Sequence, residues 1–319
     1  MILEIKELSK TYKTNRKKQL VLDSVSFHVD KGEIFSILGE NGAGKTTLIK
    51  LMVNLLTPSK GKILYKNMEI TTIGKDYYTE IGVVLEGNRN IYWYLSAYEN
   101  ILYFGRLMGL KEKEIRERGE ELLKFFGLYE DKDKKVGNFS RGMQQKLSII
   151  ISLLHEPKIL FLDEPTLGLD VVSKMDMIEK IKHLSKEDGV TVIITSHQMD
   201  VVEKVADRVM ILGEGEIQFL DTVDKLINKY SGNKYLIRVE RNLDDAEIKK
   251  YFDTVNVVRR ENDITEIEVY IDSNRLINSF LGDMVKRNIY VTHISKSQDS
   301  LEDIMYKFLK LGSDSFEDV

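Results

Sequence analysis

The sequence contains no cysteine among its 319 residues. This absence excludes disulfides, thiolate zinc sites and a cysteine nucleophile, and it is compatible with a reducing cytoplasm. Long hydrophobic runs are also missing, because stretches such as Ile149 to Leu154 are far shorter than the roughly 20 apolar residues that cross a bilayer. The opening residues Met1 to Glu7 lack a basic segment followed by an apolar one, so we expect no secretory signal. We therefore expect a chain that does not cross a membrane, which leaves docking on a membrane protein open.

Neither sign of charge is in large excess. The chain has 47 lysines and arginines against 51 aspartates and glutamates, for a net charge of −4. Proteins that bind nucleic acid carry a concentrated basic surface, whereas the short basic cluster from Lys10 to Lys18 is typical of a solvated loop. We therefore expect no nucleic-acid partner. The 42% hydrophobic and 31% charged residues are typical of a soluble globular protein, long enough for two or three domains.

A glycine-rich segment, Gly39 to Thr46, is the most informative feature that is present. It fits the phosphate-binding pattern G-x-x-x-x-G-K-[ST] and lies between an apolar, strand-like run and a helical pattern from Thr47 to Leu56, which is the context that the motif requires. The alternative is a chance glycine turn before a helix. The glycines let successive N–H groups point at phosphate oxygens, and the helix adds its positive end. Lys45 can reach the β- and γ-phosphates and the Thr46 hydroxyl can bind Mg²⁺, so we expect a nucleoside triphosphate to contact Asn41, Gly42, Ala43, Gly44, Lys45, Thr46 and Thr47.

The hydrophobic pattern of the first two thirds of the chain predicts an α/β core. Alternating apolar and polar residues over 1–30 indicate antiparallel strands joined by a charged hairpin at Thr14 to Lys18. Residues from about Asn90 to His155 contain no strand-like run and look helical, as an insert between two strands. Near-continuous apolar runs separated by helical patterns indicate a parallel sheet with helices on both faces. The expected buried strands are Ile34 to Leu38, Ile81 to Leu85, Ile159 to Leu162 and Val190 to Thr195.

The character of the sequence changes near residue 231, where Ser231-Gly232-Asn233 is typical of a linker. The next segments alternate as strand, helix, strand, strand, helix and strand, which is the ferredoxin-like order. We therefore expect a first domain over residues 1–230, with its helical subdomain at about 90–155, and an α+β domain over residues 231–319. A last helix is expected from Leu301 to Leu311, before an acidic tail. The alternating segments are Tyr235 to Val239, Asp244 to Phe252, Val255 to Arg259, Ile264 to Ile271, Arg275 to Arg287 and Ile289 to Ser295.

Three further features lie where we expect the bound nucleotide. One expected strand runs into Asp163 and Glu164 at its carboxyl end, the edge where ligands bind in open α/β sheets. Asp163 would hold Mg²⁺ through water and Glu164 would act as general base; the alternative is a strand that ends in an acidic turn. Ser140 precedes a helix, either as a second anion site or as an ordinary N-cap. His197 follows another strand and can hydrogen-bond a γ-phosphate, although a lone histidine is more often structural.

The phosphate loop, the serine-glycine motif, the Asp-Glu strand, Gly168-Leu169-Asp170 and Ser196-His197 occur in this order. Together they resemble the nucleotide-binding domain of ATP-binding cassette (ABC) transporters. The resemblance covers roughly residues 1–225. It implies a P-loop NTPase core with an N-terminal antiparallel β subdomain and a helical subdomain. It also implies ATP and Mg²⁺ as cofactors, and ATP hydrolysis coupled to transmembrane transport.

The resemblance implies a role for each motif. Tyr12 matches the aromatic residue that stacks on adenine, Asp163 and Glu164 form the Walker B pair, and His197 is the switch histidine. In the family the signature of one domain completes the nucleotide site of a second, head-to-tail domain. This implies a dimer, for which we expect two copies of this chain. The implied catalytic residues are Glu164, His197, Lys45 and Glu86; the implied metal-binding residues are Thr46, Asp163 and Glu86; the implied nucleotide contacts outside the loop are Tyr12, Ser140, Gly142 and Asp170.

The sequence departs from the family pattern at three places. The signature reads Phe139-Ser140-Arg141-Gly142-Met143, which keeps the serine and the second glycine and is similar to bacterial drug and sodium exporters. Glu86 stands where the family has its Q-loop glutamine. An ionised carboxylate only accepts hydrogen bonds, so we expect an altered dependence on Mg²⁺ or ATP. The C-terminal extension is too short and wrongly patterned for the oligonucleotide-fold extension of sugar importers, and it is similar to small α+β extensions on some exporter ATPases.

These observations predict the ATPase subunit of an ABC exporter, acting as a dimer beneath separate permease subunits on the cytoplasmic face of the cell membrane. The aromatic stretch Tyr92-Trp93-Tyr94 and nearby Tyr98 would meet the membrane subunit, or would belong to the core of the helical subdomain. Two other classes stay open: a soluble ABC ATPase of translation or DNA repair, and a regulatory protein that holds ATP without hydrolysing it. The presence of both Glu164 and His197 argues against the second.

Overall fold

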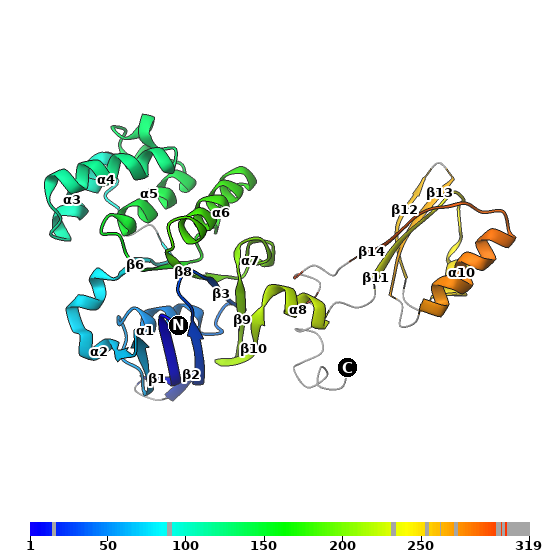
Figure 1. Ribbon diagram of the computed structural model, residues 1–319, viewed down its shortest axis with the longest axis horizontal. Coiled ribbons are helices and arrows are strands. Elements are labelled where there is room, and N and C mark those ends of the chain that lie inside the picture. Colours follow the sequence, from blue (N-terminus) through cyan, green and yellow to red (C-terminus); the bar gives the residue numbers. More distant parts are fainter. Residues whose placement is uncertain are drawn as a thin grey trace. The chain divides into compact units, whose positions relative to one another are not determined.

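The computed structural model describes residues 1–14, 17–87, 91–230, 234–252, 255–261, 263–270, 274–297, 301 and 304. The chain forms two compact units, Met1–Val223 and Asp224–Val319, and each is described by itself (Figure 1). Within the described ranges no helix is long and apolar enough to cross a membrane.

A six-stranded sheet in the order β10-β9-β3-β8-β7-β6 forms the centre of the first unit. All of its neighbouring strands pair in parallel except β10, which pairs antiparallel to β9. The four strands expected from the sequence are present within one or two residues of their predicted bounds, whereas β9 and β10 were not predicted. The strands are β3 (Ile34–Leu38), β6 (Ile81–Val84), β7 (Ile159–Asp163), β8 (Thr191–Ser196), β9 (Arg208–Gly213) and β10 (Glu216–Thr222).

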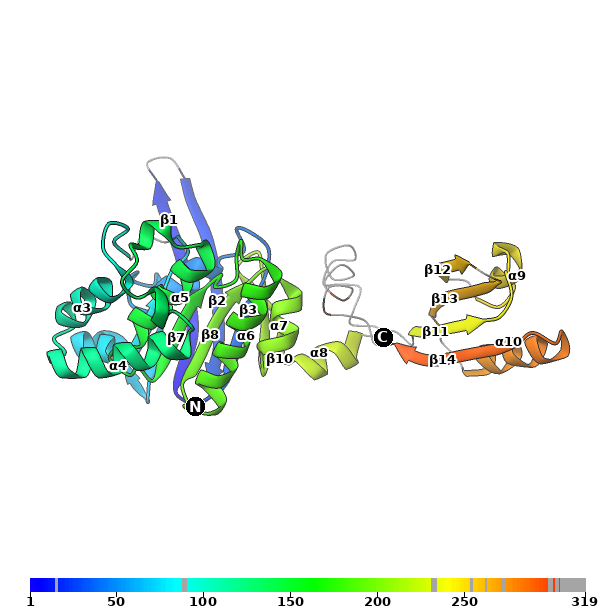
Figure 2. The same ribbon diagram turned by 90° about the horizontal axis from the view of Figure 1, so that it is seen from above.

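A second, antiparallel sheet has the order β2-β1-β4-β5. The predicted N-terminal hairpin is formed by β1 and β2, which lie side by side in both views (Figures 1 and 2). β1 also pairs with β4, a strand that the sequence analysis did not predict. The tip of the hairpin, residues 15–16, lies outside the described residues. The strands are β1 (Leu3–Thr14), β2 (Lys17–Val29), β4 (Lys60–Tyr65) and β5 (Met68–Glu69), followed by α2 (Ile70–Ile73) and a 3₁₀ segment (Gly74–Thr79).

Helices account for the rest of the first unit, and the predicted helical insert is confirmed as α3, α4 and α5 (Figure 1). The start of α3 is fixed by a capping box between Ser96 and Glu99. The helix after the phosphate loop is shorter than predicted: it ends at Met52 rather than Leu56, and Asn54 has a left-handed φ of 57° that stops it. The helices are α1 (Lys45–Met52), α3 (Ala97–Leu107), α4 (Glu112–Phe125), α5 (Arg141–Leu153), α6 (Val171–Lys186) and α7 (Met199–Val205).

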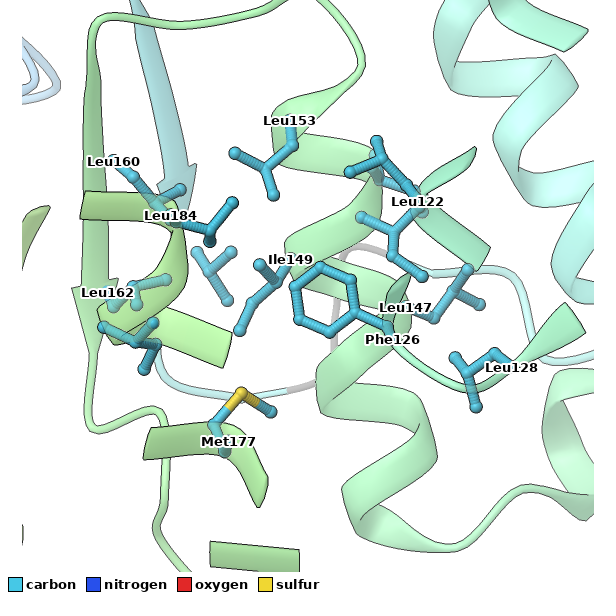
Figure 3. Close-up of a cluster of buried hydrophobic side chains, with 14 of the residues drawn as sticks. Leu122, Phe126, Leu128, Leu147, Ile149, Leu153, Leu160, Leu162, Met177 and Leu184 are labelled. Atoms are coloured by element: carbon cyan, nitrogen blue, oxygen red, sulfur yellow. The ribbon is translucent and has the colours of Figure 1, made fainter. Parts of the chain in front are cut away.

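Alternate residues of the central strands pack into two separate hydrophobic cores, one on each face of the sheet. Leu160 and Leu162 pack with residues of α3 to α7 on one face, and Figure 3 shows part of this cluster. Ile159 and Phe161 pack with α1 and the antiparallel sheet on the other face. This period of two is the pleat of the strand. The expectation of helices on both faces therefore holds for one face, whereas the second is covered mainly by a sheet.

The second unit contains the predicted β-α-β-β-α-β order, with a sheet in the antiparallel order β12-β13-β11-β14. Its own core includes Ile237, Phe252, Ile267 and Phe280. The expected linker at Ser231 to Asn233 and nearly all of the expected helix from Leu301 to Leu311 lie outside the described residues. The elements are α8 (Val223–Tyr230), β11 (Lys234–Val239), α9 (Asp245–Lys249), β12 (Val255–Glu261), β13 (Ile264–Tyr270), α10 (Asn274–Lys286) and β14 (Val291–Ser297).

The end of α1 supplies a test of this fold. Tyr77 is fully buried and its hydroxyl donates a 2.8 Å hydrogen bond to the carbonyl of Met52, the last residue of α1. Tyr77→Phe keeps the ring but leaves that carbonyl without this donor, so we expect a loss of about 1–3 kcal/mol in the free energy of unfolding, measured by urea denaturation. The control is Tyr78→Phe, because Tyr78 is exposed and bonds Asn54 at 3.3 Å. Equal stability of the two variants would contradict the role of Tyr77.

Candidate nucleotide site

The phosphate loop joins β3 to α1, and its glycines are required by its shape. Gly42 and Gly44 have φ values of 92° and 106°, which side chains with a Cβ rarely adopt. A Cβ on Gly39 would lie 2.3 Å from the carbonyl oxygen of Leu212 in β9. The loop therefore curls tightly against the central sheet, at the N-terminal end of α1. This arrangement favours an anion at that helix end.

Lys45 reaches back over the loop. Its Nζ donates to the carbonyl oxygens of Gly39 at 2.7 Å and Glu40 at 3.0 Å, and lies 4.0 Å from Oε1 of Glu164. Burial lowers the pKa of the Lys45 ammonium, while the nearby carboxylates of Glu164, Asp163, Glu86 and Glu40 act in the opposite direction. The buried Lys45 ammonium could therefore exchange its hydrogen bonds to the loop carbonyls for hydrogen bonds to phosphate oxygens.

The two acidic residues at the end of β7 are held by threonines from two other elements, Asp163 through its carboxylate and Glu164 through its backbone N–H. Oδ1 of Asp163 accepts a hydrogen bond from the hydroxyl of Thr195 in β8 at 2.6 Å, and the Thr46 hydroxyl lies 3.4 Å away. Glu164 has a left-handed φ of 51°, and its N–H donates to Oγ1 and to the carbonyl oxygen of Thr195 at 3.1 and 3.2 Å. Both carboxylate side chains are buried, at 1% exposure for Asp163 and 7% for Glu164.

His197 brings a ring nitrogen to the same carboxylate. Its Nδ1 lies 2.9 Å from Oε1 of Glu164, yet the pair does not have the alignment of a hydrogen bond, and Nδ1 has no hydrogen-bond partner among the described residues. The strand ends that carry these two residues are tied together a second time, because the Thr166 hydroxyl donates to Oε1 of Gln198 at 3.2 Å.

These side chains converge on one cavity of about 400 Å³. Asp163 and Ala43 are buried beside it without lining it. Val21 and Leu167 line it and were not predicted. The predicted site residues that line the cavity are Asn41, Gly42, Gly44, Lys45, Thr46, Thr47, Glu86, Glu164 and His197.

Besides Asp163 and Ala43, four more predicted site residues do not line this cavity. Tyr12 lies in β1, is 38% exposed and has the Lys10 ammonium 5.4 Å from the centre of its ring. Ser140 caps α5, where its hydroxyl accepts from the N–H of Met143 at 3.3 Å, and Gly142 is buried in the first turn of that helix. Asp170 caps α6 by accepting from the N–H of Ser173 at 2.9 Å. The N-cap alternative for Ser140 is thus present in the single chain.

Thr195, which contacts both Asp163 and Glu164, was also missed by the sequence analysis. It was assigned only to a buried strand, in which a threonine is common. A signal was available, because Thr195 and Ser196 are polar residues at the carboxyl end of an otherwise apolar run, at the sheet edge that carries the site.

The donor set fits a hard divalent cation that keeps several waters. Oδ2 of Asp163 and Oε2 of Glu164 are buried and without a hydrogen-bond partner among the described residues, and the Thr46 hydroxyl lies close by. Oxygen ligands of this kind suit Mg²⁺, which is usually held by one or two protein groups together with phosphate and water. No cluster of three or more His, Cys, Asp or Glu side chains in the described parts of the chain could hold a metal by itself.

Comparisons with known proteins agree with this geometry. A family described as ABC transporter matches residues 22–167. The ABC transporter ATP-binding protein NatA of Bacillus subtilis is 36% identical over 225 residues, which are 70% of this chain and 91% of the relative. The bacitracin transport ATP-binding protein BcrA of Bacillus licheniformis is 34% identical over 319 residues and 98% of both chains. The methionine import ATP-binding protein MetN 1 of Staphylococcus epidermidis is 28% identical over 99% of this chain and 95% of the relative.

A solved structure is similar as well. The dimeric post-hydrolysis state of the ATP-binding cassette MJ0796, bound to ADP and Pi, has a TM-score of 0.63 and 28% identity, and covers 70% of this chain and 99% of that one. The chain therefore belongs to the ABC transporter family. It is an ATP-binding subunit of that family and an ATPase, built on the P-loop cassette fold.

Two substitutions separate binding from turnover at this site. Glu164→Gln removes one carboxylate from the cavity and leaves the phosphate loop intact, so we expect normal ATP affinity and a fall in turnover of about 100-fold or more, the contribution of a general base.

Lys45→Ala removes the buried cation, so we expect at least a roughly tenfold weaker ATP affinity, as for the loss of a charge-assisted hydrogen bond. Titration with a fluorescent ATP analogue and a phosphate-release assay measure the two quantities. Wild-type turnover in Glu164→Gln, or wild-type affinity in Lys45→Ala, would rule out the corresponding role.

Proposed function

We propose that the chain binds Mg-ATP as the cytoplasmic motor of an ABC exporter, in which two copies close around two nucleotides beneath separate membrane subunits. The observation that carries this proposal is the convergence of Lys45, Glu164 and His197 on one cavity, together with the exclusion of Ser140 and Asp170 from it. The catalytic groups of one chain thus lie together, while Ser140 and Asp170 would be supplied by a second copy.

The residues of the cavity divide the work of hydrolysis. Glu164 accepts a proton from the attacking water, and its buried carboxylate is held beside the Lys45 ammonium. Lys45 and the loop N–H groups stabilise the charge on the β- and γ-phosphates. His197, whose Nδ1 lies 2.9 Å from Oε1 of Glu164, would hydrogen-bond the γ-phosphate. Thr46 and Asp163 would hold Mg²⁺, which would neutralise charge on the phosphate oxygens.

Glu86 gives this site an extra negative charge. Its exposed side chain lines the cavity and is one of the groups that favour the charged form of Lys45. A carboxylate here can accept hydrogen bonds from water bound to Mg²⁺, and it repels the γ-phosphate. We propose that it raises the Mg²⁺ requirement of this ATPase relative to relatives with glutamine.

The exposed start of α6 supports pairing with a second copy. Val171 and Val172 are 75% and 78% exposed, immediately after Asp170, although apolar side chains of this size favour burial. Ser140 caps the neighbouring helix α5. The similar cassette of solved structure is dimeric. We propose that these helix ends contact the nucleotide bound to the second copy. We also propose that Tyr12 of each copy stacks on the adenine of the nucleotide in that copy's own cavity.

The oligomeric state of Glu164→Gln tests this proposal. We expect a monomer without nucleotide and a dimer with Mg-ATP in light scattering, because the unhydrolysed nucleotide keeps the two copies closed. Ser140→Ala in the same background is the matched control, since it leaves the chain's own cavity intact and should weaken only the dimer. A monomer with ATP demonstrably bound would contradict self-pairing and would indicate a different cassette as partner.

An exposed aromatic surface supports docking on a membrane subunit. Trp93 and Tyr94 are 60% and 68% exposed, which favours an interface for them. Tyr98 instead packs against the core of the helical subdomain, which was the alternative interpretation of these aromatic residues.

A largely apolar cavity of about 400 Å³ opens between α3, α5 and β6. We propose that a cytoplasmic segment of the membrane subunit occupies it. Its lining includes Tyr78, Ile81, Val83, Phe104, Met108, Ile151 and His155.

We further propose that transport is directed outward. Outward transport is supported by the signature Phe139 to Met143, which is similar to exporters, and by BcrA, a bacitracin transport protein that matches over nearly the whole chain. MetN 1, an import protein, also matches over nearly the whole chain but at lower identity. We propose a location at the inner face of the cell membrane.

Chromosomal Glu164→Gln in the source organism distinguishes the two directions. An exporter of antibiotic peptides predicts a lower minimal inhibitory concentration of bacitracin with unchanged uptake of labelled methionine. An importer predicts the reverse, namely reduced methionine uptake with unchanged bacitracin resistance, and that result would overturn the proposed direction. Replacement of the variant by the wild-type gene is the control.

A further inference from the structure

Thr195 occupies a position that no motif assigns and that touches both Walker B residues. It lies near the carboxyl end of β8 and is fully buried. In the parallel pairing of β7 with β8 it is the direct partner of Asp163. Its hydroxyl donates to Oδ1 of Asp163 and accepts from the N–H of Glu164. One hydroxyl therefore bonds to two consecutive residues with different tasks.

The bond to Asp163 determines which oxygen is left for a ligand. At 2.6 Å it has the length of a hydrogen bond to an ionised carboxylate. It occupies Oδ1, whereas Oδ2 is buried and without a hydrogen-bond partner among the described residues. A second partner that fixes the rotation of a ligating carboxylate typically tunes metal affinity. The Thr195 hydroxyl thus fixes the rotation of the Asp163 carboxylate, and Oδ2 would be available to a metal ion or its water.

The bond to Glu164 supports an unusual backbone conformation. Glu164 is not a glycine, yet its φ is 51°, a conformation that costs a residue with a Cβ roughly 1 kcal/mol or more. Its N–H is shared between Oγ1 and the carbonyl oxygen of Thr195. The left-handed turn directs the Glu164 side chain to the cavity that it lines with Lys45.

We propose that Thr195 is a positioning residue for hydrolysis. Its hydroxyl holds the carboxylate of Asp163 and the backbone of the general base Glu164 in a fixed relation to each other, so that metal affinity and proton transfer depend on one side chain. The inference rests on the proposed function, namely that this cavity hydrolyses Mg-ATP. The strand ends stay joined without Thr195, because Thr166 bonds Gln198 independently.

Thr195→Val removes the hydroxyl and keeps the shape of the side chain. We expect kcat for ATP to fall by about 10- to 100-fold, the usual effect of losing such a supporting partner, and the KM for Mg-ATP to rise by about tenfold, because the metal contributes less to binding. Thr195→Ser restores a hydroxyl at the same atom, so we expect most of the turnover to return.

A second readout does not depend on turnover. The affinity for a fluorescent ATP analogue is measured with excess Mg²⁺ and with EDTA. The dissociation constant in EDTA divided by that in excess Mg²⁺ reports the contribution of the metal to binding. Thr195→Val should reduce that ratio by about tenfold and leave the affinity in EDTA unchanged, because the phosphate loop is intact.

Thr191→Val is the matched control in the same strand. Thr191 is also fully buried, and its hydroxyl accepts a 2.9 Å hydrogen bond from the N–H of Gly32, but it lies four residues from Thr195, roughly 13 Å along the strand. Both valine variants should lose similar stability in thermal unfolding. Only Thr195→Val should lose turnover and the Mg²⁺-dependent affinity.

The outcomes separate this inference from the function on which it rests. A wild-type protein that releases no phosphate from ATP would overturn the proposed hydrolysis itself. An active wild-type protein with unchanged kcat and Mg²⁺ ratio in Thr195→Val would overturn the role of Thr195 alone, as would an equal loss in Thr191→Val. If Thr195→Val does not fold, Thr195→Ala provides the same comparison against Thr195→Ser, and equal kcat in those two would likewise refute the proposal.

Discussion

The register between β7 and β8 is the constraint on which the site depends. This pairing sets Asp163 opposite Thr195, and the neighbouring pair of β3 with β8 brings the phosphate loop to the same edge. A slip of one residue would turn every side chain of a strand to the other face. Both faces of β7 are buried, in two separate cores, so such a slip would exchange two differently shaped apolar sets. The packing of the cores therefore fixes the geometry of the polar groups at the strand ends.

The site itself opposes this stability. It buries a lysine and two carboxylates whose side chains are at most 7% exposed, and buried charges are costly unless they are paired and hydrogen-bonded. Lys45 is satisfied by loop carbonyls, and Asp163 by Thr195, but one oxygen of each carboxylate has no partner among the described residues. Phosphate, metal and water would supply those missing bonds. Ligand binding and stability are thus linked at this edge of the sheet.

Much of the fold could be predicted because its elements have strong local signals. The strands β3 and β7 are uninterrupted apolar runs, and the α3 helix starts at a capping box that can be read in the sequence. Strands β4 and β10 were missed because they are polar or half-buried and depend on pairing with β1 and β9. The early end of α1 was missed because it is set by the left-handed Asn54 and by Tyr77, which lies far along the chain. The phosphate loop was readable from residue types, whereas the role of Thr195 depends on a strand register that no local pattern encodes.

The helix caps bear on the proposal that a second copy completes the nucleotide site. Both oxygens of Asp170 are used within the chain, by the N–H and the hydroxyl of Ser173, and these bonds hold the pKa of Asp170 below its usual value. Asp170 therefore fixes the start of α6 and acts through that position rather than as a free ligand. Ser140 differs, since its hydroxyl accepts one backbone bond and donates none among the described residues. Of these two capping residues, Ser140 keeps a donor at the N-terminus of its helix, where a phosphate from another chain would be favoured by the helix dipole as well.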